Sequence, residues 1–269
     1  MDLVSAALLG IVQGLTEFLP VSSSGHLILA RAFFEWDPGR FGLAFDAAVH
    51  VGTLIAVVVY FRHEVSRLLA AAPGALSGKD GEFERLGRLI IVGTIPIVIV
   101  GALFADVIEA RIRTPLIVAI NLVIGAIGLM VAERFTRRDR EPLTLGYGEA
   151  LAIGIAQAAA LAPGLSRSGL TLTVALFLGL RRETAARFVF LMSLPAVLAV
   201  AVKETLDLRE VGMAGLPVTI LAVGLVTSAI VGYVTVKYFV RYLASHSLDV
   251  FAYYRFALAA VTFVWLWTR

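Results

Sequence analysis

The stretch Gly10-Ile-Val-Gln-Gly-Leu-Thr-Glu-Phe-Leu-Pro-Val-Ser-Ser-Ser-Gly25 recurs in outline as Gly154-Ile-Ala-Gln-Ala-Ala-Ala-Leu-Ala-Pro-Gly-Leu-Ser-Arg-Ser-Gly169. A shift of 144 positions aligns the two without a gap, and six of the sixteen residues are identical. Small-residue bias explains matched glycines, but it does not explain the matched glutamines and serines. The pattern therefore predicts an internal repeat, with one copy over about 1–133 and the other over about 145–269.

Each copy of the motif joins two apolar arms through a turn rich in Pro, Gly and Ser. The arms are Leu3–Thr16 and Leu27–Phe34 in the first copy, and Ala150–Ala162 and Leu170–Leu180 in the second. A helix needs roughly 20 residues to cross about 30 Å of hydrocarbon, so each arm is too short to cross alone. The pattern predicts two re-entrant helical hairpins.

The composition predicts that lipid covers most of the surface. The 269 residues are 59% hydrophobic and 16% charged, which is more apolar than a soluble fold of this size. Six segments read as membrane spans. They are Leu43–Phe61, Leu89–Ala105, Pro115–Ala132, Phe188–Val202, Val211–Val236 and Val250–Thr268.

The distribution of Lys and Arg predicts the orientation. Loops at Arg62–Arg88, Arg134–Arg140, Arg181–Arg187 and Lys237–Arg241 carry about twice as many of these residues as the other loops, and we expect them to be cytoplasmic. Both termini are then outside, and the two hairpins enter from opposite sides. The predicted fold is an all-α polytopic membrane protein, one integral membrane domain over 1–269. It is built from two inverted-topology repeats, each a re-entrant hairpin plus three transmembrane helices.

Two absences narrow the chemistry. The sequence has no cysteine, which excludes disulfides and thiolate metal sites. It also has no basic run interleaved with aromatic residues, so we expect no nucleic-acid partner.

The first hairpin places ionisable groups in an apolar setting. Glu17 and His26 are costly there unless they are paired, hydrated or functional. Pro20 favours an end to the first arm, and the serines at 22–24 provide N-cap oxygens at the start of the next helix, which is a ready anion site. Either Ser22 or Ser23 is spaced to face the imidazole of His26. The alternative is a capped turn with only structural hydrogen bonds.

The second hairpin carries Arg167, the only charged residue between Glu149 and Arg181. Its planar guanidinium needs an anionic partner and suits phosphate or carboxylate oxygens. The repeat makes Arg167 the counterpart of Ser23. If the turns of the two hairpins, which we call their tips, face each other, they bring together a hydroxyl, an imidazole, a carboxylate and a guanidinium. This set of groups suits phosphoryl transfer.

Three other polar residues fall within the predicted spans. Asp46 and His50 are one helical turn apart, and lining the site or forming a structural pair are equal alternatives. For Arg255, near a predicted cytoplasmic end, we favour snorkelling or pairing with Asp249.

The runs Glu17-Phe-Leu-Pro-Val-Ser-Ser-Ser-Gly-His26 and Pro163-Gly-Leu-Ser-Arg-Ser-Gly-Leu-Thr171 resemble the bacterial undecaprenyl-diphosphatase family, the bacitracin-resistance type of lipid pyrophosphatase. Similar spacing extends along the whole chain. The resemblance implies removal of the terminal phosphate from undecaprenyl diphosphate, which recycles the lipid carrier for peptidoglycan synthesis and confers bacitracin resistance. It implies a divalent cation, Mg²⁺ or Ca²⁺, and a site in the bacterial inner (plasma) membrane that opens to the periplasm or exterior. The expected partners are the polyprenyl diphosphate lipid and the bilayer, and a homodimer is an open alternative.

By motif position, the resemblance implies catalytic roles for Glu17, Ser23, His26 and Arg167. We assign Ser23 as nucleophile, His26 as base or acid, Arg167 as oxyanion clamp, and Glu17 as orienter of His26 or cation ligand; His26 as nucleophile is the variant. The family's first motif begins with Glu or Gln, and Gln13 leaves this arm a single carboxylate. The residues expected to contact substrate are Gln13, Ser22, Ser24, Ser166, Ser168 and Thr171.

Two other functions compete with this interpretation. Inverted repeats with broken helices are typical of transporters, which makes a lipid-carrier flippase the main rival. The acid-phosphatase-like lipid phosphatases also use a Ser-Gly-His run, but their Lys-x6-Arg-Pro motif is absent here.

Overall fold

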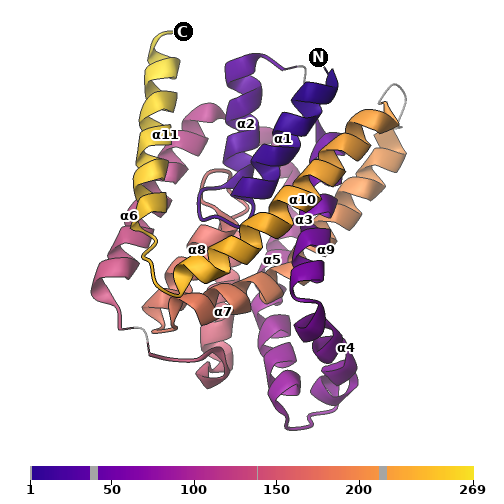
Figure 1. The fold of residues 1–269 in the computed structure, drawn as a ribbon, viewed down its shortest axis with the longest axis vertical. Helices are drawn as coiled ribbons and strands as arrows, with labels where there is room; N and C mark the ends of the chain where they lie inside the picture. The colour runs from indigo at the N-terminus through magenta and orange to yellow at the C-terminus, as the bar shows by residue number, and fades with distance from the viewer. Residues whose placement is uncertain (1, 37–41, 138, 212–216) are drawn as a thin grey trace.

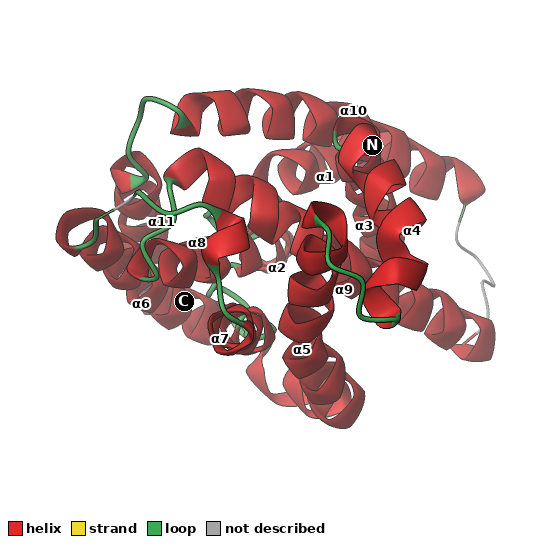
Figure 2. Cartoon of the chain, turned by 90° about the horizontal axis from the view of Figure 1, so that it is seen from below, coloured by secondary structure: helices red, strands yellow, loops and turns green. Residues whose placement is uncertain are grey.

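The computed structural model describes residues 2–36, 42–137, 139–211 and 217–269, and over these ranges the chain is helical and contains no β-strand (Figures 1 and 2). One short 3-10 helix, η1, covers Pro142–Thr144. The α-helices are α1 (Asp2–Thr16), α2 (Ser23–Phe34), α3 (Leu43–Tyr60), α4 (Arg62–Leu76), α5 (Glu82–Ile112), α6 (Pro115–Phe135), α7 (Tyr147–Ala159), α8 (Arg167–Phe177), α9 (Arg182–Val211), α10 (Val218–Leu243) and α11 (Asp249–Trp267).

Both halves begin with two short helices; the first half continues with α3, α4, α5 and α6, of which α4 has only 15 residues, and the second half continues with α9, α10 and α11. In the first half, α1 and α2 have 15 and 12 residues, and in the second half, α7 and α8 have 13 and 11. At 1.5 Å per residue these four helices are roughly 16–23 Å long, less than the thickness of the hydrocarbon core. The four predicted arms are therefore confirmed as short helices.

The chain is a multi-pass membrane protein. Five helical segments are long and apolar enough to cross a membrane: 82–104, 115–135, 182–203, 218–243 and 249–267. A sixth candidate is the bent pair α3–α4, whose axes meet at 86°. Large apolar side chains on these helices face outward, as Leu103, Ile124 and Val264 do, and such surface is stable only against lipid.

Several predicted boundaries were wrong. The segment at Arg62–Arg88, predicted as a loop, contains α4 and the start of α5. The span predicted at Val211–Val236 is displaced, because Val211 ends α9 and the next helix begins at Val218; residues 212–216 lie outside the described residues. The predicted Lys237–Arg241 loop is the last part of α10. Loss of hydrophobicity marks the edge of the membrane, but it does not end a helix whose backbone stays hydrogen-bonded.

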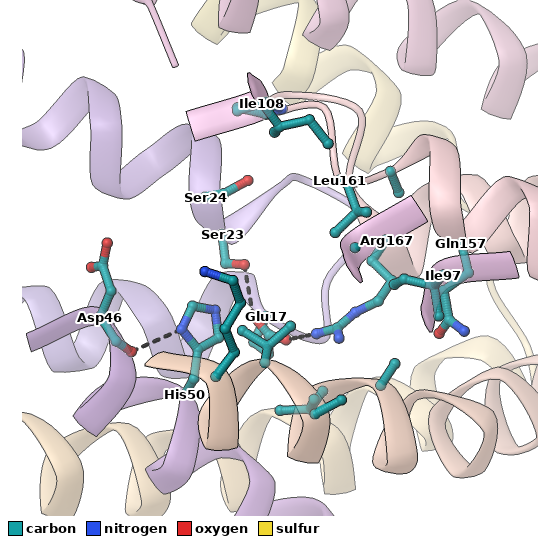
Figure 3. A pocket seen from close by; sticks show the side chains of 18 of the residues that line it. Glu17, Ser23, Ser24, Asp46, His50, Ile97, Ile108, Gln157, Leu161 and Arg167 are labelled. Carbon is teal, nitrogen blue, oxygen red and sulfur yellow. Dashed lines mark hydrogen bonds and ion pairs between the residues drawn. The ribbon is translucent and has the colours of Figure 1, made fainter. Parts of the chain in front are cut away.

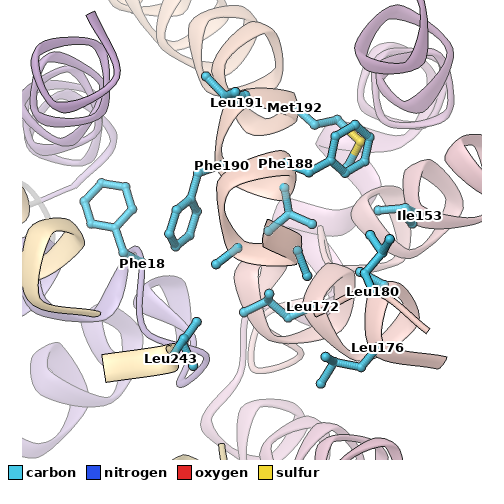
Figure 4. Close-up of a cluster of buried hydrophobic side chains, with 14 of the residues drawn as sticks. Phe18, Ile153, Leu172, Leu176, Leu180, Phe188, Phe190, Leu191, Met192 and Leu243 are labelled. Carbon is cyan, nitrogen blue, oxygen red and sulfur yellow. The ribbon is translucent and has the colours of Figure 1, made fainter. Parts of the chain in front are cut away.

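The largest cluster of buried side chains lies between the two halves of the chain. Phe188, Phe190 and Met192 of α9 pack with Leu172 of α8 and with Phe18, which follows α1 (Figure 4). The rings of Phe18 and Phe190 meet edge to face at 5.7 Å. This core fixes the turn after α1 against the second half of the protein.

Both chain ends lie at the same end of the molecule, and the α4–α5 turn lies at the opposite end (Figure 1). The turns that join α1 to α2 and α7 to α8 lie between the two ends, inside the bundle. This arrangement places the repeated motifs in the interior.

Candidate active site

The two repeated turns touch each other directly. The backbone N–H of Gly164 donates to Ser22 Oγ at 3.1 Å, and Ser168 Oγ donates to the carbonyl of Leu19 at 3.0 Å. Residues 142 and 149 positions apart in sequence thereby become hydrogen-bonded neighbours. The facing tips predicted from the repeat are present.

The same backbone geometry starts the second helix of each motif. Ser22 has φ 75° and caps α2 by accepting from Gly25 N at 3.3 Å. Ser166 has φ 71° and caps α8 by accepting from Gly169 N at 3.1 Å. Positive φ is uncommon for a residue with a Cβ atom, so its occurrence at two equivalent serines marks a shared, strained turn. The two turns therefore hold the first residues of α2 and α8, Ser23 and Arg167, in equivalent backbone geometry.

Glu17 joins the two tips. Its carboxylate is buried, forms an ion pair with Arg167, and accepts from Ser23 Oγ at 2.7 Å (Figure 3). It also accepts from Gln13 Nε2 at 2.9 Å. The half-buried guanidinium thus has the anionic partner that its position required. A hydroxyl, a carboxylate and a guanidinium meet at one point.

A cavity of about 520 Å³ opens onto this cluster. Its wall includes six of the predicted site residues: Glu17, Ser22, Ser23, Ser24, Ser166 and Arg167. Apolar residues of α5 and α9 form much of the remaining wall, among them Ile97, Val98, Ala102, Ala196, Val197 and Val200. The cavity is therefore polar where the tips meet and apolar along the two long helices.

The other four predicted site residues do not line this cavity. Gln13 supports Glu17 from behind, and Ser168 is used in the contact between tips. Thr171 Oγ1 donates to the carbonyl of Arg167 at 2.7 Å, within its own helix. Substrate contact by these residues stays a prediction.

His26 lies apart from Glu17, Ser23 and Arg167. Its Nδ1 is 2.7 Å from the carbonyl of Ser22, its Nε2 is 2.7 Å from Tyr254 OH, and its ring stacks on that tyrosine. Both ring nitrogens are thus engaged, and the expected contact with a serine hydroxyl is replaced by a contact with a backbone carbonyl.

The imidazole on the cavity wall is that of His50. Its Nδ1 is 2.8 Å from the backbone carbonyl of Asp46, so the two residues are joined through the backbone and not through the carboxylate (Figure 3). The Asp46 carboxylate, also on the wall, pairs with Arg31 and Arg113. Of the two alternatives for this pair, the structure supports lining the site.

The interpretation of Arg255 as a snorkelling residue was wrong. Its side chain is fully buried and donates to backbone carbonyls of both tips and of α6. The acceptors are Pro20 in the first tip, Gly164 and Leu165 in the second, and Asn121 and Leu122 in α6, at 2.9–3.2 Å. Backbone carbonyls in a turn inside a membrane protein need hydrogen-bond donors. The order of residues along the chain does not show which side chain provides them.

Comparison with known proteins shows the family of this chain. The family model of the bacitracin resistance protein BacA matches residues 6–261. The chain belongs to this family. It is 48% identical to the undecaprenyl-diphosphatase of Rubrobacter xylanophilus, with 97% of each chain covered. It is 42% identical to the proteins of the same name from Moorella thermoacetica, with 100% of each chain covered, and Alcanivorax borkumensis, with 99% and 100% covered.

The Glu17 carboxylate, the predicted cation ligand, has hydrogen-bond partners on both oxygens. Both oxygens of Glu17 already accept hydrogen bonds, from Arg167 on one side and from Ser23 and Gln13 on the other. Among the residues that the structure describes, no group of three or more His, Asp or Glu side chains could hold a metal ion.

Sequence reasoning missed three residues on the cavity wall and one residue that pairs with the wall. Arg113 and Lys203 line the cavity although they lie outside the predicted spans and hairpins, and Gln157 lines it although it stood out only as an identity of the repeat. Arg31, in the predicted arm Leu27–Phe34, does not line the cavity but pairs with Asp46 on its wall. The alignment of Gln157 with Gln13 in the other copy was the one available signal.

Proposed function

We propose that this chain is a membrane hydrolase that removes the terminal phosphate of undecaprenyl diphosphate and returns the monophosphate carrier to peptidoglycan synthesis, an activity that confers bacitracin resistance. The observation that carries the proposal is the Glu17 carboxylate, bound at once to Ser23 Oγ and to the Arg167 guanidinium. A nucleophile, a base and an anion-binding cation thereby share one end of a cavity in a membrane protein.

The apolar part of the cavity suits the lipid part of this substrate. The wall formed by α5 and α9 offers contacts to a hydrocarbon tail, and the polar end offers hydrogen bonds to the diphosphate. The N-termini of α2 and α8 meet at the polar end, and both favour an anion. This polarity orients the headgroup toward Ser23.

In the reaction we infer, Ser23 Oγ attacks the terminal phosphorus and gives its proton to Glu17. The bond between phosphorus and the bridging oxygen breaks, and undecaprenyl phosphate leaves. Arg167 exchanges its pairing with Glu17 for the phosphoryl oxygens and stabilises their developing charge. Water then cleaves the phosphoserine, with Glu17 returning the proton. The 2.7 Å contact supports Glu17 as base in place of His26, whose ring nitrogens are engaged elsewhere.

We infer that a divalent cation arrives with the substrate. The donors around Glu17 are already paired within the protein, whereas a diphosphate carries the oxygen ligands that Mg²⁺ prefers. Added chelator is then expected to raise the apparent KM for the lipid without changing the thermal midpoint of the protein.

We also infer two inverted repeats with re-entrant hairpins, placed in the bacterial inner membrane with the site open to the outside. Support comes from the order of short and long helices in each half and from both termini lying at one end. Arg111→Cys and Arg137→Cys are clean probes because the chain has no cysteine. An impermeant maleimide should label position 111 and not 137 in intact cells, and the opposite pattern would reverse the orientation. A homodimer stays a prediction.

The activity is tested with purified protein in detergent and undecaprenyl diphosphate. The wild type should release phosphate and Ser23→Ala should not, while Ser66→Ala, an exposed serine of α4, should match the wild type. A phosphoenzyme that survives acid would identify phosphoserine. Absence of phosphate release from the folded wild type would favour the flippase.

A further inference from the structure

Gln157 is a fully buried amide without a hydrogen-bond partner for either polar atom. It lies on α7, lines the cavity, and is 0% exposed, and neither Oε1 nor Nε2 finds a partner among the described residues. Figure 3 shows it on the same side of the cavity as Arg167. Buried polar groups of proteins are almost always hydrogen-bonded, so an amide with both ends unpaired requires an explanation.

Close packing of α7 against α5 restricts the position of this amide. One turn before it, Gly154 lies against Gly93 of α5 so closely that a Cβ atom at Gly154 would collide with the Gly93 carbonyl. Ile97, one turn further along α5, is nearly buried and also lines the cavity. The two helices hold the side chain in the cavity wall, where a leucine of similar size would cost less.

The equivalent residue in the first copy has a different environment. Gln13 is also fully buried, but its Nε2 donates to Glu17 and only its Oε1 is unpaired. The second copy has Leu161 where the first has Glu17, so Gln157 has no carboxylate one turn away. The whole amide of Gln157 therefore remains for a ligand in the cavity.

We propose that Gln157 binds the substrate diphosphate, with Nε2 donating to a phosphoryl oxygen beside the Arg167 guanidinium. A hydrogen bond to an anion is stronger than one between neutral groups, and it removes the cost of the unpaired Nε2. The inference rests on the proposed function and adds a substrate-contacting residue from the second copy.

The test is Gln157→Leu, because a structural role and a ligand role predict opposite results. Replacing an unpaired buried amide with a leucine should keep or raise the thermal midpoint, while kcat/KM for undecaprenyl diphosphate should fall roughly ten- to hundredfold. Stabilisation of the protein by farnesyl diphosphate, measured as the rise in thermal midpoint, should shrink in the same variant. Thr94→Val is the matched control, because the buried Thr94 hydroxyl is satisfied by the carbonyl of Ile90.

Three outcomes are distinguishable. Wild-type kcat/KM and wild-type ligand stabilisation in Gln157→Leu would overturn the inference and leave the proposed function intact. No phosphate release and no stabilisation in the wild type would overturn the proposed function itself. If Gln157→Leu does not fold, Gln157→Glu replaces it: the isosteric carboxylate should repel the diphosphate, and unchanged KM there would also overturn the inference.

Discussion

The turn between α1 and α2 and the turn between α7 and α8 have the same backbone and different chemistry. In both, a serine with positive φ caps the second helix, and the next residue points at Glu17. That next residue is Ser23 in one copy and Arg167 in the other. The two turns are therefore equivalent in backbone geometry, and one different side chain gives the first turn a hydroxyl and the second a guanidinium.

The difference between the copies extends to the first arm. Glu17 and Leu161 occupy equivalent positions, so one arm brings a carboxylate to the cavity and the other brings an apolar wall residue. If the two copies were identical, either two serines or two arginines would meet where the two turns are in contact. The active site depends on the two copies having diverged at the places where they meet.

Removing the charge of the second tip should have the largest effect. In Arg167→Ala the phosphoryl group loses the guanidinium proposed to stabilise its charge, and turnover should fall by about a thousandfold. Arg167→Lys should recover little, because a point charge does not copy the planar fork. The measurement is phosphate release, with Arg62→Ala as an exposed control. Turnover near the wild-type rate in Arg167→Ala would remove this residue from the mechanism.

The second largest effect on activity is expected at Arg255, which hydrogen-bonds to both tips. Arg255→Met leaves five backbone carbonyls without their donor, which should cost about 3 kcal/mol of stability and reduce kcat at least tenfold. Gly125→Ala should also lower stability and kcat, because the added Cβ would collide with Arg255 Nη2.

The readout for Arg255 combines thermal unfolding with kcat and KM. A role in positioning the tips predicts that kcat stays low at temperatures where the variant is fully folded. Loss of stability alone, with normal kcat in the folded fraction, would make Arg255 purely structural.

The N-cap serines of α2 and α8 allow the stability of the two turns to be compared directly. Ser166→Ala removes one cap and should cost about 1 kcal/mol. Ser22→Ala should cost more, because Ser22 Oγ also accepts from Gly164 N of the other tip. Thermal midpoints of the two variants test the order, and equal losses would show that the contact between tips adds no stability.

The smallest effect is expected at the ion pair between Arg140 and Glu149, at the start of α7. Arg140 hydrogen-bonds to Glu149 in the first turn of α7 at 2.8 and 3.0 Å, and this contact holds the pKa of the carboxylate below its ordinary value. A lowered pKa adds stability above the ordinary carboxylate range, and that stability is lost as the pH falls through the lowered pKa. In Arg140→Gln the thermal midpoint should therefore decline less steeply with acid than in the wild type. An identical decline in both would exclude this pair as a source of the pH dependence.

The sequence by itself determined the class of protein and predicted several residues that line the cavity. Apolar runs of membrane length predicted most of the spans, because the hydrocarbon thickness fixes how many residues a helix needs. The repeat predicted two short-armed motifs whose tips meet, and the residues that line the cavity include Glu17, Ser23 and Arg167 as expected. Local spacing carries this information because helix length and capping are local properties.

The tertiary structure alone decided which side chains share the site. Spacing along one helix predicted that His26 would face a serine hydroxyl, but packing of α11 gave it Tyr254 instead and left His50 of α3 on the cavity wall. Arg255 is 235 residues from Pro20 and yet hydrogen-bonds to it. Such contacts depend on how the long helices pack, and helix packing is set by the whole set of buried surfaces and not by any one segment.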